Sequence, residues 1–553
     1  MGTKRCLRTT MSVLLCVVFA GGFSQTWART VYVDDDAAGA QDGTSWASAF
    51  RYLQDALAVA SAGDEVRVAQ GTYPPDRGGG NGAGDHKATF RVPDSVTIKG
   101  GFASVGAPDP DSRDSALFAT ILTGDLNGND DPNDQSILGD NSFHVVTADG
   151  VSSDTVLDGL RIAYGEGDAG GGLRNIGASP IVRDCTFFRN RANEGGGGVM
   201  NTDSNAVFVG CTFLENWCGD GEGGGMENHR SHIRIEDCRF IRNYADDDGG
   251  GLSDVDGSSE VINCEFLENS ASECGGGVSA GHATFFNCVF RANSGGEGAG
   301  AISGGDVRLI LCRFLDNIGW ERVGGVACGD MVAINCTFAN NSGEEGGAIL
   351  ARSGCASLKH CTFWGNIAGG GRAGGIYCES DCSLNAHGCI FWANRGRAGG
   401  GGAITGYRAQ LFYGYLTTSS IEYCCIEGWI PDRGGTGNIG DEPLFVAPDA
   451  GDFHLKSQAG HWDAVLQAWV PDDVTSPCID AGDPLTAVEH ELFPNGGIVN
   501  MGAYGGTCEA SKSWFGTEPC PTVNAADING DCRVDAEDYR LTATRWLQPA
   551  IGP

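Results

Sequence analysis

Apolar residues recur at every second position in short stretches of the chain. Val207, Val209, Cys211 and Phe213 are each separated by one residue, and the same pattern recurs over residues 332–338. A β-strand turns successive side chains to opposite faces, whereas an α-helix repeats every 3.6 residues. The alternation therefore predicts strands, with these four residues directed to one face.

The strand pattern is part of a repeat of the form C-x-F-x-x-N. The repeat occurs nine times at intervals of 24 to 28 residues, with Phe at +2 and Asn at +5 in every copy. A fixed period in this range is typical of a solenoid, and period-two alternation favours a solenoid built from strands. We therefore expect coils of about 24 residues, each with three short strands, stacked into three parallel sheets. The repeats begin at Cys185, Cys211, Cys238, Cys264, Cys288, Cys312, Cys336, Cys361 and Cys389.

Each position of the repeat has a predicted structural role. Cys and Phe are expected to stack inward from coil to coil at a spacing of about 4.8 Å. Asn is expected at a turn, where it tolerates left-handed backbone geometry and its amide can bond the Asn of the next coil. Parallel Cβ atoms one rung apart are poorly placed for disulfides, so the ladder predicts buried, unpaired thiols. Away from the ladder, three disulfides remain open alternatives: Cys378–Cys382, Cys478–Cys508 and Cys520–Cys532.

A second signature, G-[GA]-apolar, follows a variable loop in each coil. Its glycines permit a positive φ or a close backbone approach before a strand. The pairing of F-x-x-N with G-G-[AI]-[ILV], from roughly Leu157 to Ile404, resembles the polymorphic outer-membrane protein repeat. That resemblance implies a right-handed parallel β-helix and a place at the cell surface. The apolar residues of the signature are Leu173, Val199, Met226, Leu252, Val278, Ile302, Val326, Ile349, Ile376 and Ile404.

The ends of the chain differ in character from the repeats. Residues 1–28 carry basic residues, a short apolar core and a T-W-A cleavage site, which indicates a signal peptide. In residues 29–75, apolar residues at helical spacing predict an amphipathic helix that caps the solenoid, and this region resembles the N-terminal part of pectin-lyase-like β-helix proteins. The β-helix itself is expected over residues 76–430. Residues 431–510, through S-P-C-I-D-A-G-D and N-M-G-A-Y-G-G, resemble the closing segment of secreted bacterial β-helix proteins.

The last segment, residues 520–553, contains a candidate calcium loop. Oxygen-bearing side chains stand at loop positions 1, 3, 5, 9 and 12, and position 7 offers its carbonyl, as Ca²⁺ requires. The segment resembles one EF-hand-like repeat of a type I dockerin, which implies bound Ca²⁺ and a cohesin-like partner. It departs from that family in having one repeat instead of two, and Cys532 where the loop has Gly. The predicted metal residues are Asp527, Asn529, Asp531, Arg533, Asp535 and Asp538.

Charge and hydropathy narrow the range of partners. The chain has 71 acidic and 36 basic residues, a net charge of −35, which disfavours nucleic acid and anionic membranes and suits divalent cations. After the signal peptide no run of 18 apolar residues occurs, so no integral membrane segment is expected in the mature chain. We therefore expect a monomer that is secreted or held at the cell surface.

Alignment of the coils on the glycine signature reveals one charged column. Six consecutive coils carry a polar residue four positions after the apolar one: Asp203, Arg230, Asp256, His282, Asp306 and Asp330. Two carboxylates that flank an arginine could bind an acidic sugar or abstract a proton. Asp203, Arg230 and Asp256 are therefore the candidate catalytic residues. The alternative is a solvated turn, where Asp is favoured for its backbone geometry.

Two features of the loops also bear on binding. The loop before the glycines is acidic in most coils, which gives a ridge that either holds diffuse Ca²⁺ or serves solubility. Aromatic residues beside these loops could stack on sugars or cover the edges of coils. The acidic residues include Glu194, Asp220, Glu222, Asp246, Asp247, Asp248, Glu273 and Glu297, and the aromatic ones are Trp217, Tyr244, Trp320, Trp364 and Trp392.

The sequence supports three hypotheses about function. It contains no G-x-S-x-G, H-E-x-x-H or phosphate-loop motif. It therefore favours a non-catalytic exported protein that binds polysaccharide or another cell-surface ligand along the solenoid. The alternative is a polysaccharide lyase or glycoside hydrolase that uses Asp203, Arg230 and Asp256. The third hypothesis is a structural spacer without a ligand.

Overall fold

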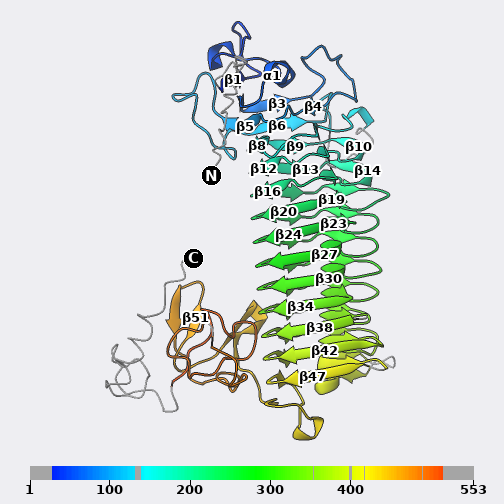
Figure 1. The fold of residues 1–553 in the computed structure, drawn as a ribbon, viewed down its shortest axis with the longest axis vertical. Coiled ribbons are helices and arrows are strands. Elements are labelled where there is room, and N and C mark those ends of the chain that lie inside the picture. The colour runs from blue at the N-terminus through cyan, green and yellow to red at the C-terminus, as the bar shows by residue number, and fades with distance from the viewer. Residues whose placement is uncertain are drawn as a thin grey trace, which may run out of the picture.

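The computed structural model describes residues 28–130, 139–352, 354–397, 402–415, 417–488 and 490–514. Over these residues the chain forms a long stack of coils, with a smaller segment beside one end (Figure 1). The predicted right-handed parallel β-helix of the all-β class is confirmed. Most of the predicted signal peptide and the whole predicted calcium loop lie outside the described residues, the loop with Asp527, Asn529, Asp531, Arg533, Asp535 and Asp538.

One coil shows how the repeat becomes structure. β16 (Val207–Val209), β17 (Thr212–Leu214) and β18 (Trp217–Cys218) form its three walls, and β19 (Met226–His229) begins the next coil. Each strand pairs in parallel with its equivalent one coil on, as β17 does with β21 (Arg239–Ile241). The walls are a 13-stranded sheet, an 11-stranded sheet and a 24-stranded sheet that takes two strands from most coils.

Two ladders run through the core at the positions that the repeat predicts. Successive Phe rings stack with centroids 4.4 to 5.0 Å apart and planes within 9°. Each repeat Asn is buried, and its Nδ2 donates to Oδ1 of the Asn one coil on at 2.8 to 3.1 Å until the last, Asn394, donates to Gln410. The predicted amide ladder and the buried, unpaired Cys ladder are both confirmed.

Two details of the strand prediction are wrong. The repeat Asn is not itself left-handed; the residue before it is, as at Glu215 with φ 54°. A second left-handed corner precedes each repeat Cys, as at Gly210 with φ 65°, and it reverses the parity of the side chains. Phe208 therefore points into the core, whereas Val207 and Val209 point outward.

The glycine signature acts through both of the predicted mechanisms. Gly196 has a φ of 60°, which an L side chain rarely adopts. Gly198 has no room for a side chain, because a Cβ there would collide with the carbonyl of Gly225 in the next coil. The coils can approach one another closely here only because the signature supplies glycine.

The N-terminal end of the stack is covered by a short helix. α1 (Leu53–Val59) lies over the first coil and buries Leu53, Ala56 and Leu57 in the same hydrophobic cluster as the solenoid core (Figure 1). This packing removes the apolar edge of the first coil from water, which an open solenoid end requires.

At the other end, residues 431–514 fold back along the side of the solenoid (Figure 1). This C-terminal segment contains two antiparallel pairs, β49 (Phe445–Ala447) with β50 (Asp452–Leu455) and β51 (His461–Asp463) with β52 (Ala468–Val470). A second hydrophobic cluster joins the segment to the coils and contains Leu315, Ala339, Ile390, Cys425, Phe445, Phe453, Leu455, Cys478 and Met501.

The cysteines outside the ladder are unpaired wherever the structure describes them. Cys478 is fully buried in the second hydrophobic cluster, whereas Cys508 is exposed, so the suggested bond between them is wrong. Cys378 and Cys382 are both buried and free. Within the described part of the chain, no helix is long and apolar enough to cross a membrane.

Candidate functional site

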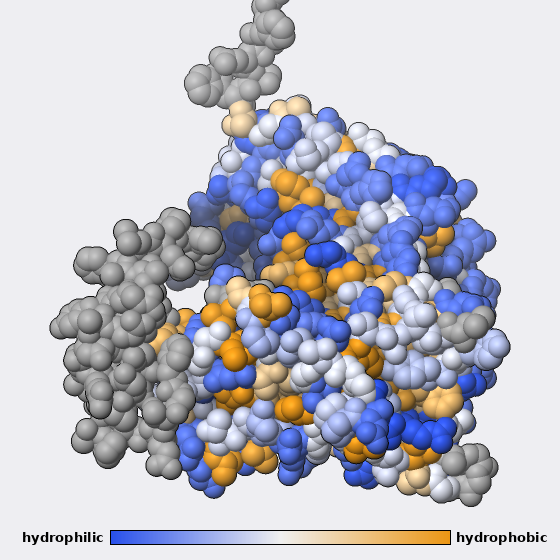
Figure 2. All heavy atoms as spheres, turned by 60° about the horizontal axis from the view of Figure 1, so that its bottom comes forward, coloured by the Kyte–Doolittle hydropathy of each residue, from blue (hydrophilic) through white to orange (hydrophobic). Residues whose placement is uncertain are grey.

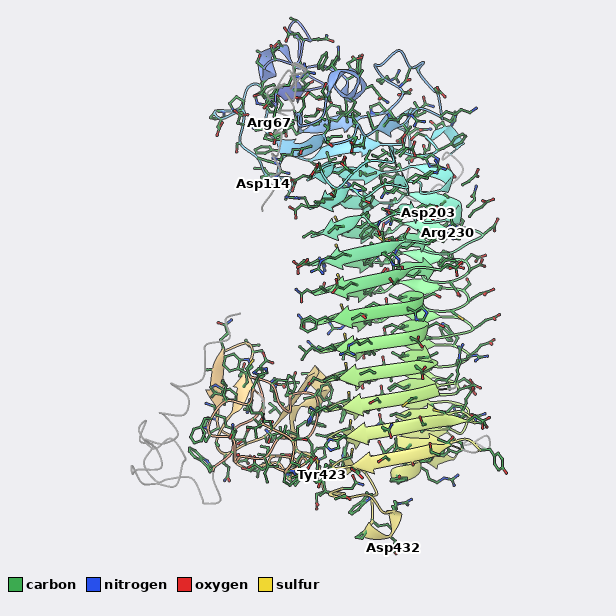
Figure 3. The ribbon with its side chains drawn as sticks, viewed as in Figure 1. Arg67, Asp114, Asp203, Arg230, Tyr423 and Asp432 are labelled. Carbon is green, nitrogen blue, oxygen red and sulfur yellow. The ribbon has the colours of Figure 1, made fainter. Side chains whose placement is uncertain are left out.

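The predicted catalytic residues Asp203, Arg230 and Asp256 lie at one turn on three successive coils, and Figure 3 labels the first two. Their φ angles of 51°, 48° and 53° are all left-handed. Arg230 donates to Asp203 from Nε and Nη2, both at 2.9 Å. This hydrogen bonding raises the pKa of Arg230 and lowers the pKa of Asp203. The arrangement matches the solvated-turn alternative. An exposed ion pair between Arg230 and Asp203 joins the turns of two neighbouring coils.

The six-residue column of the sequence alignment divides into two. From the fourth coil on, the turn between the two strands of the large sheet is two residues shorter, so the register changes. His282 consequently stands beside Ser258 and not beside Asp256. The column then continues in register through Asp306 and Asp330, and His282 Nδ1 lies 3.0 Å from Asp306 Oδ2.

Beyond this break, four strands form an outer face with three columns of side chains. The strands are β24 (Ser258–Ile262), β27 (Val278–Phe286), β30 (Ile302–Ile310) and β34 (Asp330–Ile334). The first column is polar, the second is mixed and the third is apolar. They contain, in order, Ser258, His282, Asp306 and Asp330; Glu260, Thr284, Arg308 and Val332; and Ile262, Phe286, Ile310 and Ile334.

A shallow groove of about 520 Å³ lies over the first two columns. Its polar groups are hydroxyls, carboxylates, an imidazole and one guanidinium, that of Arg308. Arg308 is exposed, and its charge has no ion-pair partner among the described residues. The groove therefore offers hydrogen-bonding groups along the solenoid axis at about the 4.8 Å spacing of the rungs.

The apolar column leads into a larger cleft of about 760 Å³ between the coils and the C-terminal segment. The coils contribute Ile310, Leu311 and Arg313, and the C-terminal segment contributes Leu492 and Tyr504. Leu311 is 37% exposed and Leu492 is 41% exposed, so apolar surface faces the water in the cleft. Seen from the C-terminal end of the stack, hydrophobic patches interrupt a mainly hydrophilic surface (Figure 2).

Hydrogen bonds hold the C-terminal wall of the cleft against the coils. Asn335 Nδ2 donates to the carbonyls of Ala503 at 2.9 Å and Gly505 at 2.7 Å. The Ala503 N–H in turn donates to Thr362 Oγ1 at 2.9 Å. The cleft therefore has a fixed width, set by direct contacts between residues about 140 to 170 positions apart.

A histidine supports the aromatic wall of the cleft from behind. The His454 ring stacks on Tyr504 with centroids 3.7 Å apart, and its Nδ1 lies 2.6 Å from Asp452 Oδ1. Burial lowers the pKa of His454, but the hydrogen bond to Asp452 and the Glu509 carboxylate, 3.7 Å from Nε2, outweigh it and leave the pKa raised. The His454 imidazole, held by Asp452, thus supports one face of the Tyr504 ring.

The predicted aromatic residues fall into three groups. Trp217 and Tyr244 stack on each other along the solenoid axis, with planes 12° apart, and Arg191 covers the other face of Trp217 at 4.4 Å. Their faces are therefore occupied by neighbours in the same column. Trp364 and Trp392 pack against the second hydrophobic cluster, where they cover the coil edges. Trp320 is 69% exposed.

One polar ladder was not expected from the sequence. Asn175 donates to Asn201, Asn201 to Asn228, and Asn228 to Asp254, each at 2.7 Å, inside the core. The ladder ends at Asp254, which accepts the last of these hydrogen bonds, because the next residue in register is Ala280. The signal was a polar residue two positions after the apolar residue of the glycine signature in four consecutive coils.

Comparison with protein families locates three matches along the chain. A right handed beta helix region matches residues 134–283, a Chlamydia polymorphic membrane protein repeat matches residues 335–352, and a family described as disaggregatase related matches residues 398–482. Each match covers less than half of the chain. The last one spans the end of the coils and the beginning of the C-terminal segment.

Two solved structures are similar to this chain at low sequence identity. A pectate lyase is 12% identical, with 86% of this chain and 96% of that chain covered and a TM-score of 0.35. A rhamnogalacturonan lyase is 12% identical, with 76% of this chain and 91% of that chain covered and a TM-score of 0.23. No curated protein matches the chain. The family matches and the coordinates together place the chain among right-handed parallel β-helix proteins in fold.

Proposed function

We propose that this chain is an exported, surface-exposed β-helix that binds a polysaccharide without cleaving it. The observation that supports this proposal is the continuity between the outer face and the cleft. Ile310 belongs to the apolar column of the face and also lines the cleft. A polymer chain that lies along the polar columns can therefore extend across the apolar column and place an end, or one unit, in the cleft. Binding sites form preferentially at such junctions between parts of a protein.

The chemistry of the cleft suits a sugar ring. Leu311, Leu492 and Tyr504 offer apolar surface for the C–H face of a ring, and Arg313 offers donors for hydroxyl or carboxylate groups. Arg313 is exposed and, within the described residues, has no ion-pair partner. Arg313 therefore gives the cleft a cationic group in a chain whose net charge is −35.

The lyase or hydrolase alternative needs a carboxylate that can accept or donate a proton near neutral pH. Asp203 is bound by Arg230, whose hydrogen bonds lower the pKa of Asp203 and make it a weaker base. Asp203 and Arg230 also remain about half exposed, with side-chain exposures of 55% and 51%, so no burial strengthens their interaction with a substrate. These features disfavour catalysis at this turn.

The proposal includes a calcium-binding tail. Asp527, Asn529, Asp531, Arg533, Asp535 and Asp538 would hold one Ca²⁺ in the dockerin-like module of residues 520–553. The module would connect the binding solenoid to a cohesin-like partner outside the cell. A calcium titration of the Asp527→Ala variant tests this part separately from glycan binding.

The test of the main proposal is glycan binding by the mature full-length chain on an array of neutral and acidic polysaccharides. Loss of an arginine hydrogen bond to a ligand costs about 1.5 to 3 kcal/mol, so Arg313→Ala should weaken binding roughly 10- to 100-fold. Arg291→Ala is the matched control, because Arg291 is exposed one coil away and does not line the cleft. Equal affinities of the two variants, or release of reducing ends or unsaturated products by the wild type, would contradict the proposal.

A further inference from the structure

A buried glutamate lies beneath the acidic loops. Glu227 follows Met226 in β19, and its side chain points away from the core because Met226 and Asn228 point inward. The loops nevertheless cover it, so that Glu227 is only 7% exposed. A Cβ added to Gly195 would collide with Glu227 Oε2, which shows that the carboxyl group lies directly against the loop backbone of the preceding coil.

A second glutamate, Glu222, lies beside Glu227 in the acidic loop just before β19. Glu222 pairs with Gly195 in an isolated parallel bridge, so its backbone lies beside the residue that covers Glu227. Its Oε2 accepts a hydrogen bond from Ser253 Oγ at 2.5 Å. Ser253 is the register partner of Glu227 on the next strand, β23 (Leu252–Val255). The hydrogen bond therefore holds the Glu222 carboxylate over the rung adjacent to Glu227.

Neither glutamate is paired with a lysine or arginine in the part of the chain that the structure describes. Across the described residues, no ion pair involves Glu222 or Glu227, and Glu227 Oε2 has no hydrogen-bond partner. An ionised Glu227 would need a donor at this atom, and a protonated one would need an acceptor. Burial of an ionised carboxylate without a partner costs several kcal/mol. The described residues therefore leave Glu227 Oε2 without a hydrogen-bond partner and the two carboxyl groups without a cation.

The negative charges around Glu227 make its ionisation still more costly. Burial raises the pKa of Glu227 to about 8, and the negative charge of Glu222 contributes. Burial also raises the pKa of Glu222, with Asp248 and Asp247 adding to the effect, while Ser253 and His229 act in the opposite direction. The neighbouring Cys218 thiol is kept protonated by burial and by the same carboxylates, with a pKa of about 12.

We propose that Glu222 and Glu227 form a binding site for a hard divalent cation such as Ca²⁺, with Ser253 as a neighbouring oxygen. Ca²⁺ takes six to eight oxygen ligands from carboxylates, hydroxyls, carbonyls and water, which is the chemistry present here. The cation would supply the positive charge that the loops lack and would hold the loops of two coils together. This site is independent of polysaccharide binding and of the C-terminal calcium loop.

The experiment is a Ca²⁺ titration by calorimetry on the full mature chain carrying Asp527→Ala and Asp538→Ala, which removes the predicted C-terminal site. This background should still bind Ca²⁺ at one site, and addition of Glu227→Gln should weaken that binding at least about tenfold. Proton release should accompany binding below about pH 8, because the cation displaces the proton of Glu227.

The matched control is Glu297→Gln, which removes one exposed carboxylate from the same acidic ridge. It should leave the affinity and the proton release unchanged. Circular dichroism verifies that each variant is folded, and Glu222→Gln serves as a second probe if Glu227→Gln is not. Absence of Ca²⁺ binding in the background chain, or equal affinities for Glu227→Gln and Glu297→Gln, would overturn the proposal.

Discussion

Replacement of Glu227 by glutamine in Ca²⁺-free buffer should remove a loss of folding stability that the wild type shows as the pH rises. The glutamine has nearly the same shape, so it can occupy the space under Gly195 without a new collision. It cannot ionise, and its amide can donate a hydrogen bond to the Glu222 carboxylate. The variant therefore isolates the electrostatic cost of the carboxylate from the packing of the loop.

The size of this stability loss follows from the pKa of Glu227. An unfolded glutamate has a pKa of 4.5, and the folded protein raises it to about 8. For an acid whose pKa is raised by folding, the folded state holds the proton more tightly, so stability is highest below pH 4.5 and falls as the pH rises to about 8. At about 1.36 kcal/mol for each pKa unit, the loss reaches at most about 5 kcal/mol at pH 8 and above.

The assay is urea unfolding followed by circular dichroism and by fluorescence, with EDTA present, at several values between pH 5 and about pH 8. The free energy of unfolding of wild type should fall over this range relative to that of Glu227→Gln. The difference between the two proteins should be small near pH 5 and should approach a few kcal/mol near pH 8. Parallel curves for the two proteins would show that Glu227 does not carry a raised pKa.

Three other predictions test the core and the C-terminal segment. Asn293→Ala removes four side-chain hydrogen bonds in the middle of the amide ladder and should lower the free energy of unfolding by about 4 kcal/mol in urea. Phe290→Ala should cost about 3 to 5 kcal/mol in the same assay, whereas Phe286→Ala, at a site that is 41% exposed, should cost under about 1.5 kcal/mol; equal losses would contradict the inward ladder. His454 has a raised pKa, so its contribution to the C-terminal segment is fully present below pH 6.5 and is lost as the pH rises through its folded pKa. Limited proteolysis should accordingly cut residues 431–514 faster at higher pH in wild type, and this pH dependence should be absent in His454→Gln.

The repeat made the fold predictable because its three fixed residues have strict physical requirements. A buried asparagine needs partners, and the next asparagine in the stack supplies them, so the ladder through Asn293 could be foreseen. Which side chains point inward in the strand before the cysteine could not be foreseen from alternation alone. A left-handed residue such as Gly210 reverses parity, which is why Phe208 and not Val207 points inward. The regular spacing between repeats did not reveal where such corners lie.

The candidate site was predicted less completely, because it depends on contacts over long distances in the sequence. The alignment placed His282 after Asp256, but a turn two residues shorter put it beside Ser258. The cleft could not be expected at all, since it depends on contacts, such as those of Asn335, that hold residues far along the chain against the coils. Glu227 had a visible signal, a carboxylate at a position where the next two coils have serine. Its burial followed only from the path of the loops.

The most direct test of the central claim is a structure of the mature chain with a bound oligosaccharide from a polysaccharide that the array identifies. A sugar ring is expected in the cleft, in contact with Arg313 and Tyr504, with further units along the polar columns of the outer face. An intact oligosaccharide in that position would establish the binding role. A sugar bound at Asp203 and Arg230 instead, above all a cleaved one, would rule out the binding role of the cleft and favour an enzyme.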